Sequence, residues 1–115
     1  VIFTPLTEET RNLITLNELK QMKKTAILIN AARGGIVNEA DLFTALKENI
    51  IWAAGSDVFE TEPISSNHPL LSLHNFLGLP HIGSATIETR QAMMQCNVDS
   101  LIAAAKGETI PYRVV

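Results

Sequence analysis

The sequence contains a single cysteine, Cys96, so the chain can form no internal disulfide bond. Scarce cysteine fits a reducing compartment, and the neighbouring Met93 and Met94 indicate that this thiol packs in a helix rather than taking part in redox chemistry. No apolar run approaches the roughly 20 residues that a membrane-spanning helix needs. No set of His and Cys has the spacing of a zinc site. We therefore predict neither a bound metal nor a membrane partner.

Strong positive charge is also missing. Lys and Arg total 9 against 12 for Asp and Glu, the formal net charge is −3, and the basic residues are scattered along the chain. The sequence thus lacks the concentrated basic surface that is typical of nucleic-acid binding and of attachment to anionic membranes. We expect no nucleic acid among its partners.

What is present indicates a folded domain. Hydrophobic residues make up 46% of the chain and charged residues 18%, which is ordinary for a globular protein and unlike a disordered one. A chain of 115 residues is one domain or a piece of one. It begins at Val1, in what reads as the middle of a strand, and we interpret it as a fragment. We expect a cytoplasmic protein and leave organellar targeting by an upstream segment open.

The chain is organised around residues 26–37, where apolar residues give way abruptly to a different composition. Ile27 to Ile29 predict a strand that is buried on both faces. The next residues, 30–35, end that strand and predict a tight turn at its carboxyl end, where open α/β sheets bind their ligands. Arg33 in this turn is suited to bind an anion, although an arginine beside glycines is about as often a solvated turn residue.

Apolar periodicity, caps and breakers predict the other elements. The end of a strand is predicted at Val1–Phe3, and further strands are predicted at Ile50–Ala54, carrying on to Phe59, and at Phe76–Leu79. Helices are predicted from Thr15 to Met22, with a Thr15–Glu18 capping box, from a cap at Asn38 to about Asn49, and from Thr86 to Lys106, where Gly107 stops the helix. Glu60–Pro69 is predicted as an ordered loop and Leu70–Leu73 as a helical turn. The long helix has an apolar face of Ala92, Met93, Val98, Leu101, Ile102 and Ala105. Trp52 is interpreted as a core or interface residue. This alternation predicts an α/β fold with a parallel sheet.

Ionisable side chains follow three of the predicted strands. Arg33 comes after the first, Asp57 and Glu62 after the second, and His81 after the last. We expect them to converge, because the carboxyl ends of parallel strands share one edge of a sheet. Arg33 could then bind a carboxylate through two hydrogen bonds, and His81 could give a proton to a carbonyl oxygen. Glu62 within reach of His81 would favour the charged imidazole.

Each of these residues also has a purely structural interpretation. A histidine in a Pro-His-Ile-Gly segment, such as His81, is more often bonded to backbone than catalytic. Glu62 by itself would be a surface carboxylate, and Asp57 could simply cap a loop. For His68 and His74, in polar loops, we keep the structural interpretation alone.

Several motifs, in their order and spacing, resemble the D-isomer-specific 2-hydroxyacid dehydrogenases. They are Asn30–Gly35, Asp57–Pro63 and Pro80–Thr86, together with Thr4–Thr10 and Met22–Ala26. The similarity covers essentially the whole chain. Within the family, Asn67–Leu71 and Leu79–Thr86 look most like glyoxylate/hydroxypyruvate reductases.

The resemblance implies a role for each matching residue. Arg33 would bind the carboxylate of a 2-oxo acid, His81 would donate the proton during reduction, and Glu62 would pair with His81, which makes these three the catalytic residues. Substrate contacts would come from Arg33, His81 and Ser84. The cofactor, NAD(P)H, with NADPH favoured for a glyoxylate/hydroxypyruvate reductase, would be contacted by Thr4, Pro5, Ala31, Ala32, Arg33, Asp57, His81 and Gly83.

The same resemblance implies how the chain is divided. Residues 1–85 would form the second half of a Rossmann-type NAD(P)-binding domain, and residues 86–115 a helix that returns toward a substrate domain. The family's Gly-x-Gly-x-x-Gly fingerprint does not occur in the 115 residues, and we expect it upstream together with the substrate domain. The fragment alone should therefore be inactive, and the complete enzyme a homodimer that reduces glyoxylate or hydroxypyruvate. The alternative is a dinucleotide-gated, corepressor-like binding module of the same family without significant turnover.

Overall fold

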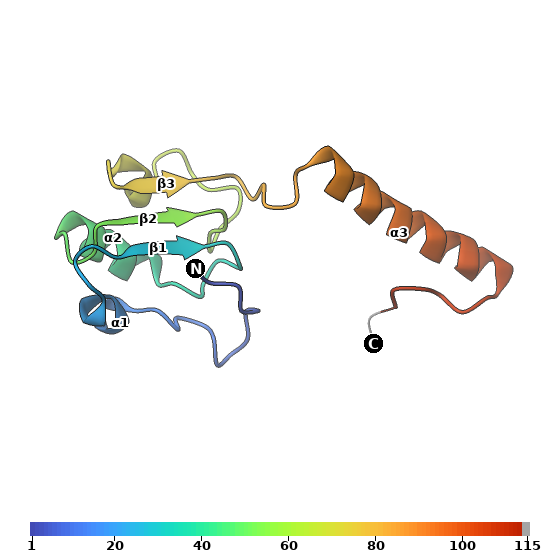
Figure 1. The fold of residues 1–115 in the computed structure, drawn as a ribbon, viewed down its shortest axis with the longest axis horizontal. Coiled ribbons are helices and arrows are strands. Elements are labelled where there is room, and N and C mark those ends of the chain that lie inside the picture. Colours follow the sequence, from blue (N-terminus) through green and yellow to red (C-terminus); the bar gives the residue numbers. More distant parts are fainter. Residues whose placement is uncertain (114–115) are drawn as a thin grey trace. The chain divides into compact units, whose positions relative to one another are not determined.

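The computed structural model describes residues 1–113 and divides into two compact units, Val1–Ile82 and a second unit that begins at Gly83. The first unit contains the strands β1, β2 and β3, the helices α1 and α2 and a short 3-10 helix, η1, and the second contains the helix α3 (Figure 1). None of the helices in this described part of the chain combines the length and the apolar character needed to cross a membrane.

Three parallel strands form the sheet of the first unit, in the order β1-β2-β3 (Figure 1). Their bounds are β1 Ile27–Asn30, β2 Ala53–Ser56 and β3 Phe76–Gly78. The register aligns Ile27 with Ala53, and Ala54 with Phe76. The predicted α/β architecture with a parallel sheet is thereby confirmed, and the carboxyl ends of all three strands lie along one edge.

The start of the chain lies beside β1. Ile2 N donates to Ile29 O at 2.9 Å, and Ala31 N donates to Ile2 O at 3.4 Å, which makes one isolated parallel bridge. The neighbouring Phe3 is 77% exposed. The strand end predicted at Val1–Phe3 is therefore present only as this single bridge.

The second strand begins three residues later than the predicted strand at Ile50–Ala54. The cause is the way in which the preceding helix ends. Ile50 N donates to Ala45 O at 2.8 Å, and Asn49 has a left-handed φ of 55°, so the chain is still closing the helix where the strand was expected. The ladder can begin only after this turn, at Ala53.

The helices of the first unit begin at the predicted capping residues. Thr15 caps the first helix, and Glu18 accepts in return from Thr15 N at 2.8 Å, which confirms the predicted capping box. Asn38 caps the second helix by accepting from Asp41 N at 3.0 Å. The helical elements are α1 (Leu16–Gln21), α2 (Glu39–Lys47) and η1 (Pro69–Ser72).

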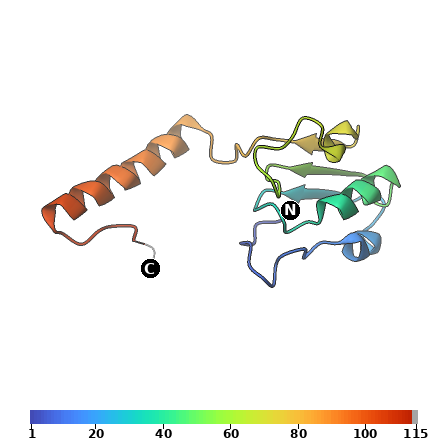
Figure 2. The same cartoon turned by 180° about the vertical axis from the view of Figure 1, so that it is seen from behind.

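The hydrophobic core lies between α2 and one face of the sheet, and Figure 2 shows α2 in front of the strands. Its largest fully buried side chains include Leu46, Ile51 and Leu70. Burial of such a side chain stabilises the fold by about 1.5–3 kcal/mol. The core consists of Leu19, Leu28, Val37, Leu42, Ala45, Leu46, Ile51, Ala54 and Leu70.

The opposite face of the sheet is open within the first unit. Ile27 is 52% and Leu77 62% exposed, whereas Leu28, which points to the other face, is 6% exposed. The prediction that residues 27–29 are buried on both faces is thus wrong for this unit, because its helices cover only one face (Figure 2). Trp52 is 64% exposed, so it is not a core residue here either.

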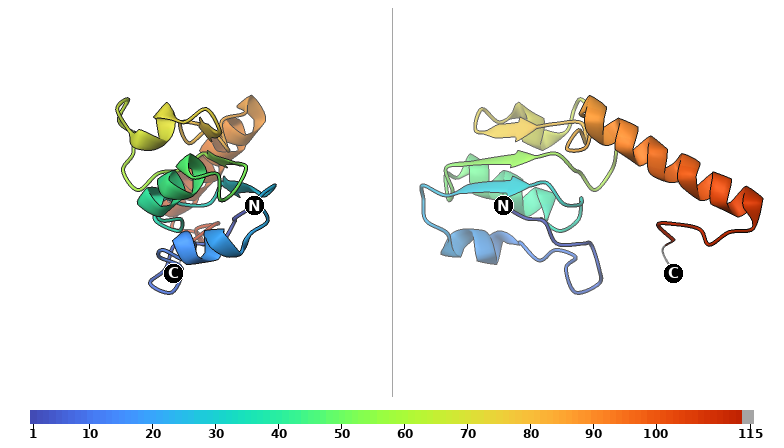
Figure 3. Two further views of the ribbon diagram at one scale, coloured as in Figure 1. Left: turned by 90° about the vertical axis from the view of Figure 1, so that its left-hand side faces the viewer. Right: turned by 45° about the vertical axis from the view of Figure 1, so that its right-hand side comes forward.

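The second unit consists of the helix α3, Ile87–Lys106, and the segment that follows it (Figure 3). Thr86 caps α3 by accepting from Thr89 N at 3.2 Å, and Gly107, with φ 69°, ends the helix as predicted. Ser100 Oγ donates to Pro111 O at 2.9 Å. The segment after the helix therefore folds back along it.

Candidate active site

The turns that follow the three strands lie along one edge of the sheet. β1 ends at Asn30, β2 at Ser56 and β3 at Gly78, and the three arrowheads point the same way in Figure 1. The ionisable residues predicted for this edge follow these strand ends and are Arg33, Asp57, Glu62 and His81. The topology therefore brings the three turns, with these four residues, to the same side of the first unit.

Asn30 shapes the turn after β1 with its own side chain. It is 5% exposed, its Oδ1 accepts from Ala32 N at 3.2 Å, and its Nδ2 donates to Arg33 O at 3.0 Å. A buried amide needs such partners, and here they are the backbone groups of the turn itself. We predicted that Asn30 would lie outside the strand, but it is the last residue of β1. Its bracing role was missed, although asparagine before a turn is a recognised signal.

Arg33 is exposed and lies at the end of this turn. Its Nη1 donates to the backbone oxygen of Ala32 at 2.7 Å, so the guanidinium is partly oriented by its own turn. A guanidinium has five N–H donors, and one such bond still permits a two-pronged contact with a carboxylate. The arrangement is compatible with the predicted anion binding.

Gly34 brings the turn into direct contact with the loop after β2. A Cβ atom at this position would overlap the carbonyl group of Phe59. The next residue, Gly35, has a φ of 82°, which a side chain rarely tolerates. The glycine pair is therefore what allows the turn that carries Arg33 to lie against the segment that leads to Glu62.

Glu62 and His81 form a hydrogen-bonded pair. His81 Nδ1 lies 2.7 Å from Glu62 Oε2, and Phe59 N donates to Glu62 Oε1 at 2.9 Å. The bond from His81, and then the bond from the Phe59 amide, hold the pKa of Glu62 below its usual value, while partial burial and the nearby Asp57 oppose this shift. An ionised carboxylate only accepts, so Nδ1 carries the hydrogen. The ring is 47% exposed, which leaves Nε2 for a further partner.

The backbone at His81 is in the left-handed conformation, with φ 55°. Such a conformation costs a non-glycine residue about 1–2 kcal/mol. The turn is held by Asp57, whose Oδ1 accepts from Ile82 N at 2.8 Å, and Asp57 N donates in turn to Asn30 O at 3.0 Å. The carboxylate of Asp57 thus does cap a loop, which was its structural interpretation, and the loop that it caps is the one that presents His81.

Two cavities open near this edge. One, of about 610 Å³, is lined by Phe3, Thr4, Pro5, Leu6, Ala31, Ala32 and Arg33. The other, of about 460 Å³, is lined by Phe59, Glu62, Pro63, Ile64, Pro80 and His81. The structure thus brings Arg33 together with four residues predicted to contact the cofactor, and Glu62 together with His81. The three predicted catalytic side chains are thus divided between these two cavities.

Two further predicted residues, Gly83 and Ser84, belong to the second unit. Their cofactor and substrate roles therefore remain predictions. Among residues 1–113, no three His, Cys, Asp or Glu side chains are grouped as metal ligands.

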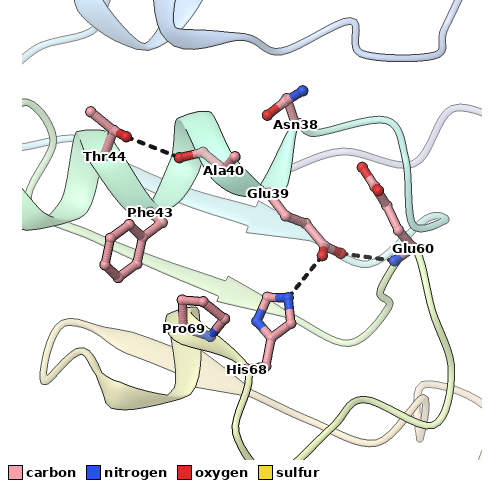
Figure 4. Close-up of a pocket in the computed structure, with 8 residues that line it drawn as sticks. All are labelled: Asn38, Glu39, Ala40, Phe43, Thr44, Glu60, His68 and Pro69. Atoms are coloured by element: carbon pink, nitrogen blue, oxygen red, sulfur yellow. Dashed lines mark hydrogen bonds and ion pairs between the residues drawn. The ribbon is translucent and has the colours of Figure 1, made fainter.

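His68 has a partner that the sequence did not indicate. Its Nε2 lies 3.1 Å from Glu39 Oε2, and Glu39 Oε1 accepts from Glu60 N at 2.8 Å (Figure 4). These residues line a cavity of about 620 Å³ between the start of α2 and the loop after β2. The sequence predicts an ordinary loop histidine at His68, and Glu39 is an acidic residue in the first turn of α2. No local signal predicts their contact, because 29 residues separate them.

Comparison with known proteins places this geometry in a family. The family model described as "D-isomer specific 2-hydroxyacid dehydrogenase, NAD binding domain" matches residues 1–83. A glyoxylate/hydroxypyruvate reductase B from Serratia proteamaculans is 56% identical over 106 residues, which is 92% of this chain and 33% of the relative. The chain thus spans about a third of the length of the curated relatives that it matches.

Solved structures agree with this result. A protein from Thermus thermophilus superposes with a TM-score of 0.92 at 43% identity, over 97% of this chain and 36% of the other. The NADPH-dependent glyoxylate/hydroxypyruvate reductase of Sinorhizobium meliloti, in complex with NADP and malonate, has a TM-score of 0.81 at 42% identity, over 88% of this chain and 31% of the other. Since the family model covers most of the chain, the protein belongs to the D-isomer specific 2-hydroxyacid dehydrogenase family.

Proposed function

We propose that the complete protein reduces a small 2-oxo acid, glyoxylate or hydroxypyruvate, to the 2-hydroxy acid with NAD(P)H, and that this chain supplies the acid–base pair. The proposal depends mainly on the 2.7 Å hydrogen bond between His81 Nδ1 and Glu62 Oε2 beside the carboxyl edge of a parallel sheet. The substrate class is supported by the similarity of this chain to relatives that are named for these two acids. The complete enzyme would act as a homodimer, which is an expectation from the family resemblance.

The cavity beside Arg33 fits the nicotinamide end of the cofactor. It measures about 610 Å³, lies beside the strand ends, and is lined apart from Arg33 by uncharged residues, among them Thr4, Pro5, Ala31 and Ala32. Bound there, NAD(P)H would supply the hydride that reduces the carbonyl carbon of the substrate. NADPH is the better candidate, because the Sinorhizobium meliloti relative is described as NADPH-dependent. In the assembled protein, Asp57 and Gly83 would complete the contacts.

His81 supplies the proton that this reduction requires. When both ring nitrogens are protonated, Nδ1–H remains bonded to Glu62, and the Nε2 proton passes to the carbonyl oxygen, which becomes the hydroxyl group. Glu62 stabilises the charged ring, and the lowered pKa of its carboxyl keeps it ionised at neutral pH. In the reverse direction Nε2 accepts the proton of the hydroxyl group.

Arg33 binds the other end of the substrate. Its guanidinium can form two parallel hydrogen bonds to the substrate carboxylate, which fixes the position of the adjacent carbonyl group. Ser84 is the remaining candidate for a substrate contact. Because the chain has no Gly-x-Gly-x-x-Gly segment, the 115 residues alone should not turn over glyoxylate with NADPH in a spectrophotometric assay.

The test is the turnover of the full-length enzyme with glyoxylate and hydroxypyruvate, followed by oxidation of NADPH. His81→Ala should lower kcat by at least about 100-fold, since it removes the general acid. His74→Ala is the matched control, because His74 is an exposed loop residue, and it should leave kcat unchanged. If His81→Ala keeps most of its turnover, the proton donor is wrongly assigned. A wild-type enzyme that binds NADPH but reduces neither acid would contradict the proposal and favour the corepressor-like alternative.

A further inference from the structure

We propose that Glu39 and His68 act as positioning residues for the reaction, by holding the loop of residues 59–68 so that Glu62 meets His81. The two side chains lie outside both cavities at the carboxyl edge and are not among the residues predicted for the site. This inference rests on the proposed function, because it assigns a role in the acid–base step of that reaction.

One carboxylate holds both ends of the loop. Glu39 Oε1 accepts from Glu60 N at 2.8 Å near the start, and Glu39 Oε2 accepts from His68 Nε2 at 3.1 Å at the end, just before η1 (Figure 4). A carboxylate has two oxygens, and here each bonds a different end of the same loop. We call this group of Glu39, Glu60 N and His68 the loop latch.

The latch is attached to the rigid part of the first unit. Glu39 is the first residue of α2, where the partial positive charge of the helix end favours a carboxylate. Later in the same helix, Leu42 and Leu46 are almost fully buried in the core. The position of the Glu39 carboxylate is therefore set by a packed helix rather than by the loop that it binds.

Between these two points the loop makes local bonds, from His68 N to Ser65 O at 2.9 Å and from Asn67 N to Ser65 Oγ at 3.3 Å, and Glu62 adds its bonds to Phe59 N and His81. Residues 61–63 and 65–67 are exposed, so burial contributes little to their position. His68 Nδ1 is buried and has no hydrogen-bond partner among residues 1–113, so the ring depends on Glu39 for its side-chain hydrogen bonding. Loss of Glu39 would leave the partly buried ring without a side-chain hydrogen-bond partner and the loop without the bonds at its two ends.

The latch is directly connected to the acid–base pair. Glu60, whose amide is held by Glu39, follows Phe59, whose amide donates to Glu62 Oε1 at 2.9 Å. The second oxygen of Glu62 receives the 2.7 Å bond of His81. A shift of the backbone at residues 59–60 thus moves Glu62 relative to His81, and small misplacements of catalytic groups reduce rates strongly.

The experiment compares single and double variants of the full-length enzyme. Glu39→Ala should lower kcat for hydroxypyruvate by roughly 10- to 100-fold and leave the KM for NADPH within about twofold of wild type. Glu39→Gln should fall between Glu39→Ala and wild type, because an amide has one acceptor oxygen and keeps both bonds only if the His68 ring takes the tautomer in which Nε2 accepts, which leaves a hydrogen on the buried, unpartnered Nδ1. In both variants the alkaline limb of the kcat–pH profile should move to lower pH, because Glu62 supports the protonated general acid less well.

Asp41→Asn is the matched control. Asp41 also lies in the first turn of α2, and its Oδ2 accepts from the backbone of a distant segment, Leu16 N, at 3.0 Å, but within residues 1–113 it forms no hydrogen bond or ion pair with the loop. This variant should lower the melting temperature about as much as Glu39→Gln and leave the kcat–pH profile unchanged. If Asp41→Asn and Glu39→Gln give the same kcat–pH profile, the role of Glu39 is only structural and the proposal is overturned.

A double-variant cycle with Glu62→Gln gives the deciding measurement. If the latch acts through Glu62, Glu39→Ala should have little further effect on kcat in the Glu62→Gln background. Full additivity of the two effects would overturn the inference. The proposed function fails separately, if wild type reduces neither acid or if Glu62→Gln has wild-type kcat.

Discussion

The turn after β1 and the loop after β2 both carry site residues, but they are held in different ways. The turn is braced from within, because Asn30 bonds backbone groups two and three residues further along the chain. The loop is held from outside, because Glu39 binds backbone and side-chain groups 21 and 29 residues away. One segment of the candidate site is thus positioned by its own sequence and the other by a distant helix.

A substitution at Gly34, where the turn and the loop touch, should have the largest effect on stability and activity. Gly34→Val places side-chain atoms where the carbonyl group of Phe59 lies, so turn and loop must separate. Overpacking of this kind costs about 3 kcal/mol or more. We expect a large fall in melting temperature and in kcat/KM, measured on the full-length enzyme.

Gly107→Ala is the control for this variant. Gly107 has a φ of 69° but nothing within 4 Å of a Cβ atom, so alanine there adds only backbone strain, about 1–2 kcal/mol. Equal effects of Gly34→Val and Gly107→Ala would mean that the contact between turn and loop does not matter.

A change within the turn should have a smaller and different effect. Asn30→Ala removes both side-chain bonds that shape the turn and should destabilise the protein by about 1–3 kcal/mol. Because Arg33 is displaced, the KM for the 2-oxo acid should rise more than kcat falls, the reverse of the effect expected for Glu39→Ala. Asn67→Ala, an exposed loop residue, should change neither constant. A fall in kcat at unchanged KM would show that turn and loop are not held independently.

The smallest expected effect concerns acid stability. The folded protein lowers the pKa of Glu62, so its bonds to His81 and Phe59 contribute stability that is present above the usual value of 4.5 and is lost as the pH falls through the lowered folded value. The pair is partly exposed, so the contribution is at most about 1 kcal/mol. The melting temperatures of wild type and Glu62→Gln should therefore differ at neutral pH and converge below pH 4.5. A melting-temperature difference between wild type and Glu62→Gln that grows toward acid pH would contradict the lowered pKa of Glu62 in the folded protein.

The predictions that succeeded rest on local patterns. Thr15 with Glu18, Asn38 and Gly107 each mark a helix end through bonds or dihedral angles that involve residues at most four positions away. The alternation of strands and helices along the chain predicted the parallel sheet. The motif order predicted the family, which the match over residues 1–83 confirms.

The predictions that failed depend on tertiary packing. The apolar Ile27 gives no sign of which sheet face the helices of this unit leave open. The start of β2 moved because α2 closes with a bond from Ile50 N to Ala45 O, which apolar periodicity does not reveal. The contact of Glu39 with His68 arises only when α2 and the loop after β2 are packed together.

The bond between His81 and Glu62 can be tested most directly by nitrogen-15 NMR of the histidine rings in the full-length enzyme, with the His81 signals assigned by their loss in His81→Asn. In the neutral ring the bond requires the hydrogen on Nδ1, so Nδ1 should give the signal of a protonated nitrogen, and Glu62→Gln should shift it. A neutral ring with its hydrogen on Nε2, unaffected by Glu62→Gln, would contradict the acid–base pair.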